Sequence, residues 1–116
     1  MSRESATLLD MLKAARLAVA FRAGMDKRAF RDDAKTQSAV LHQLLVLGEA
    51  GKRVSQEFRA RHKEIPWKKI VGMRDKLIHE YDDVDLDEVW KTVSSDVPRL
   101  ISLLEPLAPN KERNES

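Results

Sequence analysis

Three residue types suited to phosphate chemistry lie within eight positions in the stretch RDKLIHEYDD, Arg74 to Asp83. The guanidinium of Arg74 stays charged, and its planar fork matches phosphate oxygens. The imidazole of His79 can take up or release a proton near neutral pH, and Tyr81 offers a hydroxyl. Asp75 could orient Arg74 or a histidine of a second chain, or be a plain surface acid. The stretch is either a site for phosphate chemistry or an amphipathic helix with a polar end.

The helical wheel separates two of these residues. At about 100° per residue, Arg74 and Tyr81 lie about 20° apart, whereas Arg74 and His79 lie about 140° apart. For Arg74 and His79 to act on one phosphate, either the helix loosens before His79 or a second copy of the chain supplies the counterpart. A symmetric dimer would gather two arginines and two histidines around one axis.

Composition limits the other kinds of site. The 116 residues, 42% hydrophobic and 34% charged, can bury one modest core, so we predict one domain. The absence of cysteine excludes disulfides, thiolate metal sites and a cysteine nucleophile. His42 and His62 fit structural or solvated roles, and we expect no metal and no cofactor. No stretch resembles a signal peptide or a membrane span, which predicts a cytoplasmic protein with no membrane partner.

The charges are unevenly distributed. Residues 52–76 contain nine Lys or Arg against three acids, and residues 80–88 contain six acids and no Lys or Arg. A basic block beside an acidic one could hold and orient a polyanion, or both could be solvated surface.

Apolar residues recur three and four positions apart, which predicts an all-α fold. We predict a first helix that ends near Gly24, a short element over 26–32, and a long helix that continues to Phe58. Gly48 and Gly51 in that long helix indicate close approach of a neighbouring backbone or a tolerated weak point. The apolar stripes comprise Leu8, Met11, Leu12, Ala15 and Val19, then Val40, Leu44, Leu47, Gly51, Val54 and Phe58.

Later boundaries follow from capping residues and prolines. A helix should begin at about Pro66 and carry Arg74 on its apolar stripe. The last helix should begin at Asp85, with Glu88 bonding back to that cap, and should bend at Pro98. The predicted fold is an antiparallel four-helix bundle with an additional short helix over residues 1–107, and a mobile polar tail over residues 108–116.

The same helix carries a family resemblance. Arg74 and His79 fit the pattern R-x4-H with a polar residue after the arginine, which resembles the signature of HEPN domains. The longer block IPWKKIVGMRDKLIHEYDDVDLDEVW resembles the HepT toxin branch, whose motif extends to R-x4-H-x-Y and includes Tyr81. Chance often supplies the short pattern, whereas the extended block in a helical chain of this length is specific. The resemblance covers the chain from the first helix through the last.

The resemblance implies a homodimer with a composite cleft and metal-independent endoribonuclease activity on an RNA substrate. It assigns Arg74 and His79 as catalytic residues. It also implies an antitoxin partner, a minimal nucleotidyltransferase that uses ATP to adenylylate Tyr81. The chain would be the toxin of a toxin–antitoxin pair.

The chemistry of RNA cleavage agrees with these residue types. Cleavage without a metal needs a base for the 2′-hydroxyl, an acid for the leaving oxygen and a cation for the phosphate. One His79 per chain supplies one proton carrier, so a dimer supplies the second. Two other functions stay open. The bundle could be a non-catalytic dimeric scaffold for the nucleotidyltransferase, with the acids of residues 82–88 as docking surface. It could also sense nucleotides, with Arg74 holding a phosphate and no bond broken.

Overall fold

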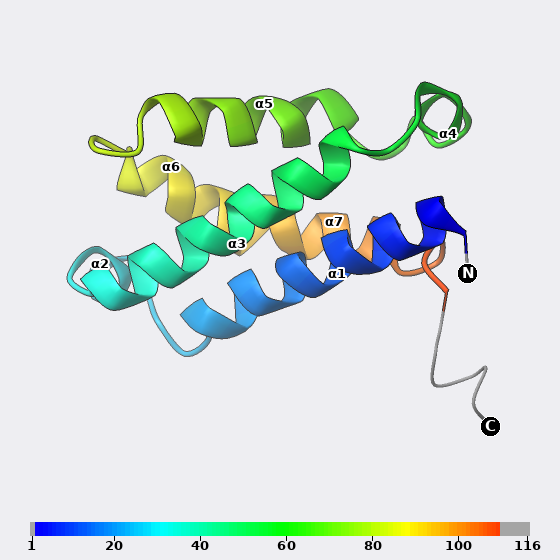
Figure 1. Cartoon of the computed structure of the whole chain (residues 1–116). Coiled ribbons are helices and arrows are strands. Elements are labelled where there is room, and N and C mark those ends of the chain that lie inside the picture. The colour runs from blue at the N-terminus through cyan, green and yellow to red at the C-terminus, as the bar shows by residue number, and fades with distance from the viewer. Residues whose placement is uncertain (1, 110–116) are drawn as a thin grey trace.

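The computed structural model describes residues 2–109, and every regular element in this range is helical (Figure 1). The all-α class predicted from the sequence is confirmed. The elements in chain order are α1 (Arg3–Arg22), α2 (Lys27–Arg31), α3 (Ala34–Lys52), α4 (Gln56–Arg61), α5 (Trp67–His79), α6 (Leu86–Lys91), the π-helical turn η1 (Thr92–Asp96) and α7 (Val97–Leu104).

Side-chain caps determine where most of these helices begin. Each cap accepts a hydrogen bond from a backbone N–H of the first turn, a donor that otherwise has no partner. The end of α1 is marked by Gly24, whose φ of +79° favours glycine. The predicted end of the first helix and the predicted short element α2 are both confirmed. The capping residues are Ser2, Asp26, Asp33, Ser55 and Asp85.

The prediction that the long helix continues to Phe58 is wrong, because α3 ends at Lys52. Ser55 accepts a hydrogen bond from the N–H of Phe58 at 3.1 Å and so starts α4. The guanidinium of Arg59 donates to the carbonyl oxygens of Gly51 and Lys52 at the end of α3. A capping serine and a returning arginine therefore end α3 and turn the chain into a separate short helix.

The start of α6 departs from the prediction in one contact. Asp85 caps the helix as predicted, accepting from the N–H of Glu88 at 3.2 Å. The side chain of Glu88 does not bond back to Asp85; it accepts a hydrogen bond from Lys76 of α5 at 2.6 Å. Glu88 thus connects α6 to α5.

The last helical run changes geometry near Pro98. Proline has no N–H, and its ring crowds the carbonyl four residues earlier. Just before it the backbone widens into η1, where the N–H of Val97 bonds to the carbonyl of Thr92, one residue beyond the α-helical partner. The sequence predicted a bend at Pro98, and the structure shows a π-helical turn just before it.

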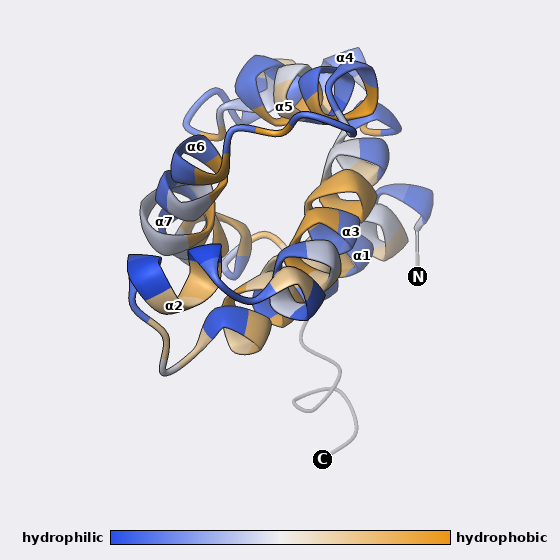
Figure 2. Cartoon of the chain, turned by 90° about the vertical axis from the view of Figure 1, so that its left-hand side faces the viewer, coloured by the Kyte–Doolittle hydropathy of each residue, from blue (hydrophilic) through white to orange (hydrophobic). Residues whose placement is uncertain are grey.

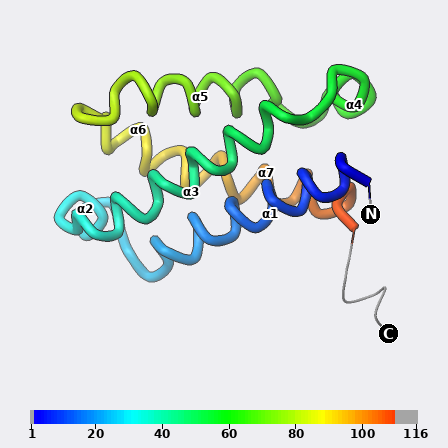
Figure 3. The backbone as a smooth tube through the Cα atoms, viewed as in Figure 1, coloured from blue at the N-terminus to red at the C-terminus, as the bar shows by residue number. Residues whose placement is uncertain are grey.

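The longer helical runs alternate in direction, as the colour sequence of Figure 3 shows. α3 packs along both α1 and α5, and α7 packs along α1. In the end-on view of Figure 2 the strongest hydrophobic colour runs along α3. The largest fully buried side chains of the core are those of Phe30, Leu8, Met11, Leu44, Leu47, Ile65, Leu104, Val40 and Val93.

Two findings concern the ends of the described chain and its apolar content. Leu107 and Ala108, after α7, are partly buried against the core. The predicted tail falls mainly on residues 110–116, which lie outside the described residues.

Within residues 2–109, no helix combines the length and the apolar character needed to cross a membrane.

Candidate active site

Arg74 lies in the middle of α5, on the side that faces α3. Its backbone and the base of its side chain rest on Gly48, where an added Cβ would lie 3.3 Å from the Cα of Arg74 and closer still to its Cβ. One turn further along α3, a Cβ added to Gly51 would lie 3.0 Å from Cγ2 of Ile70. The two glycines let α3 and α5 approach closely where the arginine sits, so the close-approach alternative predicted from the sequence is confirmed.

Two carboxylates hold the guanidinium of Arg74. Its Nε donates to Oε1 of Glu49 on α3, Nη2 forms an ion pair with the same oxygen, and Nη1 donates to Oδ1 of Asp75 at 2.8 Å. A guanidinium has two N–H groups on each terminal nitrogen. Each terminal nitrogen of Arg74 therefore keeps one N–H that these carboxylates do not use. The side chain is 21% exposed, so part of it is open to solvent.

The pKa values agree with this pairing. The hydrogen bond to Asp75 is the main cause that raises the pKa of Arg74, with the contact to Glu49 acting in the same direction. The hydrogen bond from Arg74 lowers the pKa of Asp75, and the nearby side chains of Lys52 and His79 lower it further. The pair stays charged at neutral pH, and Lys52 and His79 both belong to the surroundings of Asp75.

His79 is the last residue of α5 and is exposed. It lies one turn beyond Asp75 and on the same side of the helix, because the two residues are four positions apart. α5 stays helical through His79, so the helix does not loosen before it. Within one chain Arg74 contacts Asp75, and among the described residues no hydrogen bond or ion pair joins Arg74 to His79. A histidine supplied by a second copy stays a prediction.

Tyr81 lies just past α5, in the turn that leads to α6, and is 79% exposed. Its neighbours Glu80, Asp82 and Asp83 are exposed as well. No part of the described fold covers this side chain, so another protein can reach its hydroxyl.

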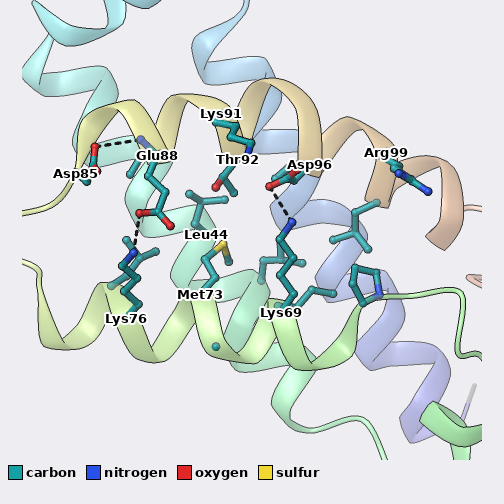
Figure 4. Close-up of a pocket in the computed structure, with 18 of the residues that line it drawn as sticks. Leu44, Lys69, Met73, Lys76, Asp85, Glu88, Lys91, Thr92, Asp96 and Arg99 are labelled. Atoms are coloured by element: carbon teal, nitrogen blue, oxygen red, sulfur yellow. Dashed lines mark hydrogen bonds and ion pairs between the residues drawn. The ribbon is translucent and has the colours of Figure 1, made fainter.

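A groove of about 630 Å³ lies between α5 and the run formed by α6, η1 and α7 (Figure 4). Its floor is apolar, with Leu44 of α3 and Met73 of α5 among the lining residues. Two ion pairs cross it, Lys76 with Glu88 at 2.6 Å and Lys69 with Asp96 at 3.5 Å. Neither Arg74, His79 nor Tyr81 lines the groove, so it is separate from the predicted catalytic residues.

The other two histidines have structural or surface positions, as predicted. The ring of His62 packs on Phe58 with 4.3 Å between centroids, and its backbone carbonyl accepts a hydrogen bond from Nε1 of Trp67 at 2.9 Å. His42 is exposed on α3. Within residues 2–109, no three His, Cys, Asp or Glu side chains gather in a group that could hold a metal ion.

The sequence reasoning missed Glu49. It lies 25 positions before Arg74 on another helix, so no local spacing joins the two residues. One signal was available, since Glu49 is the only acid in α3 and directly follows the glycine that indicated a close approach. A single carboxylate beside a close helix contact is a candidate partner for an arginine on the neighbouring helix.

Known proteins that resemble this chain are named as ribonucleases. The family model described as "Ribonuclease HepT-like" matches residues 11–107. A "Probable ribonuclease HepT" of Thermococcus cleftensis is 47% identical over 78 residues, which cover 67% of this chain and 71% of that protein. A "Putative RNase" (MJ0127) of Methanocaldococcus jannaschii is 35% identical over 107 residues, covering 92% of this chain and 88% of that protein. No solved structure matches the chain. The chain belongs to the HepT-like ribonuclease family.

Proposed function

We propose that this ribonuclease is the toxin of a toxin–antitoxin pair and that it cleaves RNA internally, without a metal ion, in a cleft shared by two copies of the chain. The observation that carries the proposal is the guanidinium of Arg74, held by Glu49 and Asp75 with one N–H left on each terminal nitrogen. Such a fork suits two oxygens of one phosphate. His79 of the same chain lies on another face of α5, which favours a histidine supplied by the second copy.

The proposed reaction uses two histidines and no other proton carrier. One His79 takes the proton of a ribose 2′-hydroxyl as its oxygen attacks the neighbouring phosphorus. The bond from phosphorus to the 5′-oxygen breaks, and a protonated His79 of the other copy gives that oxygen a proton. The fork of Arg74 holds the non-bridging oxygens while negative charge builds on them. The products are a 2′,3′-cyclic phosphate and a free 5′-hydroxyl.

We propose that a minimal nucleotidyltransferase acts as the antitoxin and adenylylates Tyr81. The phenolic oxygen would attack the α-phosphorus of ATP, pyrophosphate would leave, and the hydroxyl proton would go to solvent or to a base of the partner. The 79% exposure of Tyr81 supports this step. Two positions separate Tyr81 from His79, so an added adenylyl group would bring bulk and negative charge to the edge of the RNA site.

The exposed acids beside Tyr81 favour a second candidate function, in which the chain is a non-catalytic scaffold for the nucleotidyltransferase. Glu80, Asp82 and Asp83 form no ion pair with any residue of the range 2–109. They are available to dock a basic protein. Under this function the purified chain should cleave no RNA, and reversing these three charges should weaken its complex with the nucleotidyltransferase.

Cleavage assays on purified variants test the catalytic proposal. Arg74→Ala and His79→Ala should each abolish RNA cleavage and growth arrest, whereas His42→Ala, a histidine exposed on α3, should keep both. Circular dichroism checks that each variant is folded. Full cleavage by both folded variants would reject the catalytic assignment.

Intact mass after co-expression with the nucleotidyltransferase tests the antitoxin proposal. A gain of one or more adenylyl groups that is lost in Tyr81→Phe would support it. An unchanged mass in a stable complex would instead favour the scaffold.

A further inference from the structure

The outward side of α5 carries exposed groups beyond the catalytic motif. Lys68, Asp75 and His79 lie within about 40° of one another on the helical wheel, with Lys68 about 16 Å from His79 along the helix axis. All three are exposed. Gly72 lies between Lys68 and Asp75, and no heavy atom approaches within 4 Å of a Cβ placed there. This side of α5 is therefore open to solvent at Lys68, Gly72, Asp75 and His79.

The basic residues near this side divide into engaged and available ones. Arg59 bonds backbone carbonyls, and Arg53, Lys69, Arg74 and Lys76 pair with carboxylates. The remaining basic residues of the segment 52–76 are exposed and form no ion pair with any carboxylate of residues 2–109. These are Lys52, Arg61, Lys63 and Lys68.

The available cations lie at one end of the molecule, where α3 ends and α5 begins (Figure 1). Lys52 is close enough to Asp75 to lower the pKa of that carboxyl group, which connects it to the catalytic motif. The loop that carries Lys63 is fixed, because Nε1 of Trp67 donates to the carbonyl of His62 at 2.9 Å. These cations therefore sit on anchored backbone.

We infer that Lys52, Lys63 and Lys68 hold the backbone of the RNA outside the cleavage site. The inference rests on the proposed RNA cleavage. It adds which residues of this chain bind the RNA phosphates that are not cleaved. An RNA backbone carries one negative charge per nucleotide and suits cations spread over this distance. Beyond His79 in the other direction lie the exposed acids of residues 80–83, which repel phosphates. The substrate therefore extends from the catalytic motif toward α4.

Binding of a fluorescent single-stranded RNA of mixed sequence, measured by anisotropy over a range of salt concentrations, tests the inference. The variant combines Lys52→Gln, Lys63→Gln and Lys68→Gln with His79→Ala, so that the RNA stays intact. Each single-strand phosphate contact contributes about 0.7 to the slope of log affinity against log salt, or roughly fivefold at 0.1 M salt. Loss of three contacts should reduce the slope by about 2 and the affinity by on the order of 100-fold.

The matched control removes the same charge elsewhere. Lys13→Gln, Lys35→Gln and Lys91→Gln, in the same His79→Ala background, change exposed lysines on α1, α3 and α6 and should change the slope by less than about 0.7. Equal slopes and affinities for the two triple variants would overturn the inference and leave the three lysines available to an acidic protein partner.

Lys63→Gln and Lys68→Gln, without the change at Lys52 and in the chain with His79 intact, separate this inference from the catalytic one. They should raise KM and leave kcat within about twofold, since uniform binding is lost without a change at the reacting phosphate. A chain that binds RNA through these lysines but never cleaves it would reject the catalytic proposal and keep the binding surface. A fall in kcat with unchanged KM would count against the binding surface.

Discussion

At the scale of single residues, the site is balanced in charge rather than strongly positive. Glu49 and Asp75 together outweigh Arg74, and Lys52 restores the balance. A neutral cluster attracts a phosphate weakly, so the carboxylates contribute mainly by fixing the direction of the guanidinium. Fixed donors stabilise a transition state more than mobile ones, because they need no reorganisation during the reaction. Glu49 and Gly48 therefore matter to catalysis although neither has to touch RNA.

Removing Glu49 should affect turnover more than substrate binding. In Glu49→Ala the guanidinium of Arg74 keeps its charge but loses its contact on α3, so we expect kcat to fall on the order of 100-fold, with a smaller change in KM. Glu49→Gln keeps one acceptor oxygen, so its kcat should lie between that of Glu49→Ala and that of the wild type. Single-turnover cleavage measures both parameters.

A carboxylate outside the site serves as the control for Glu49. Glu57→Gln, an exposed substitution on α4, should leave kcat unchanged. Unchanged kcat in Glu49→Ala as well would show that Asp75 alone positions the arginine.

Adding one methyl group at Gly48 should separate α3 from α5. The new Cβ would overlap the side chain of Arg74, and overpacking of this kind costs about 1–3 kcal/mol, against a gain of about 1 kcal/mol from replacing a helical glycine. We expect Gly48→Ala to lower the unfolding free energy and to reduce cleavage, because Arg74 is displaced. Thermal unfolding and a cleavage assay measure the two effects.

Gly72 provides the matched substitution on the other helix. A Cβ there meets no heavy atom within 4 Å, so Gly72→Ala should stabilise the protein by about 1 kcal/mol and keep its activity. Equal behaviour of the two alanine variants would mean that the close approach of α3 and α5 is not required.

At the scale of elements, α5 depends on how its ends are held. It packs mainly against α3, and one of its flanks is open while the other borders the groove. Its N-terminal end follows α4, and α4 is tied to α1 because Glu4 accepts from the N–H and Oγ of Ser55 at 3.0 and 2.9 Å. A small cap far from Arg74 thus helps to place the helix that carries it.

Removing this cap should loosen α4 without unfolding the bundle. Ser55→Ala loses an N-cap hydrogen bond and the hydrogen bond that the Ser55 hydroxyl donates to Glu4. We therefore expect about 1 kcal/mol of destabilisation, which is a fall in Tm of roughly 4–8 °C. Ser38→Ala, an exposed serine inside α3, should not lower Tm.

The same contact gives a pH dependence. Hydrogen bonds from Ser55, first from its N–H and then from its hydroxyl, lower the pKa of Glu4 below 4.5. A carboxyl group whose pKa is lower in the folded state than in the unfolded state stabilises the fold at pH values above its unfolded-state pKa. This stability is lost as the pH falls through the folded-state pKa. Between roughly pH 6 and pH 3, Glu4→Gln should therefore lose less Tm than the wild type does. An identical loss in both proteins would exclude the contact as a source of acid sensitivity.

Local sequence patterns predicted most of the helices. They failed where a contact between residues far apart in the sequence determines the structure. The cap at Asp85 and the helix start at Pro66 depend on residues within one turn, so both could be predicted from the sequence. The end of α3 depends on Arg59 reaching back to carbonyls seven and eight residues away, and the apolar spacing continued past it without interruption. The role of Glu49 depends on a contact between two helices and could not be predicted from spacing.

At the scale of the whole molecule, the proposed reaction needs two copies of the chain. Arg74 and His79 lie on different faces of a regular helix, and the described chain supplies no second histidine beside either of them. A two-fold axis near the C-terminal half of α5 would bring the arginine of one copy to the histidine of the other. It would also cover Ile78, which is 43% exposed and lies directly before His79.

Mixing the wild type with an inactive variant tests this arrangement. In a co-refolded mixture of wild type and His79→Ala, the mixed dimer should cleave no RNA, because it keeps only one of the two histidines that the reaction uses. Native mass spectrometry checks that mixed dimers form. Mixed dimers that are as active as wild-type dimers would show that one histidine is enough and would reject the two-histidine reaction.

The contact between Gly48 and Arg74 also constrains how this family can diversify. A side chain larger than hydrogen at the glycine position removes the space in which the arginine lies, and loss of the arginine removes the reason to keep a glycine that weakens its helix. Family members that lose cleavage activity should therefore acquire alanine or a larger residue at the position of Gly48. The combination of Gly48 and Arg74 can then distinguish active nucleases from inactive relatives.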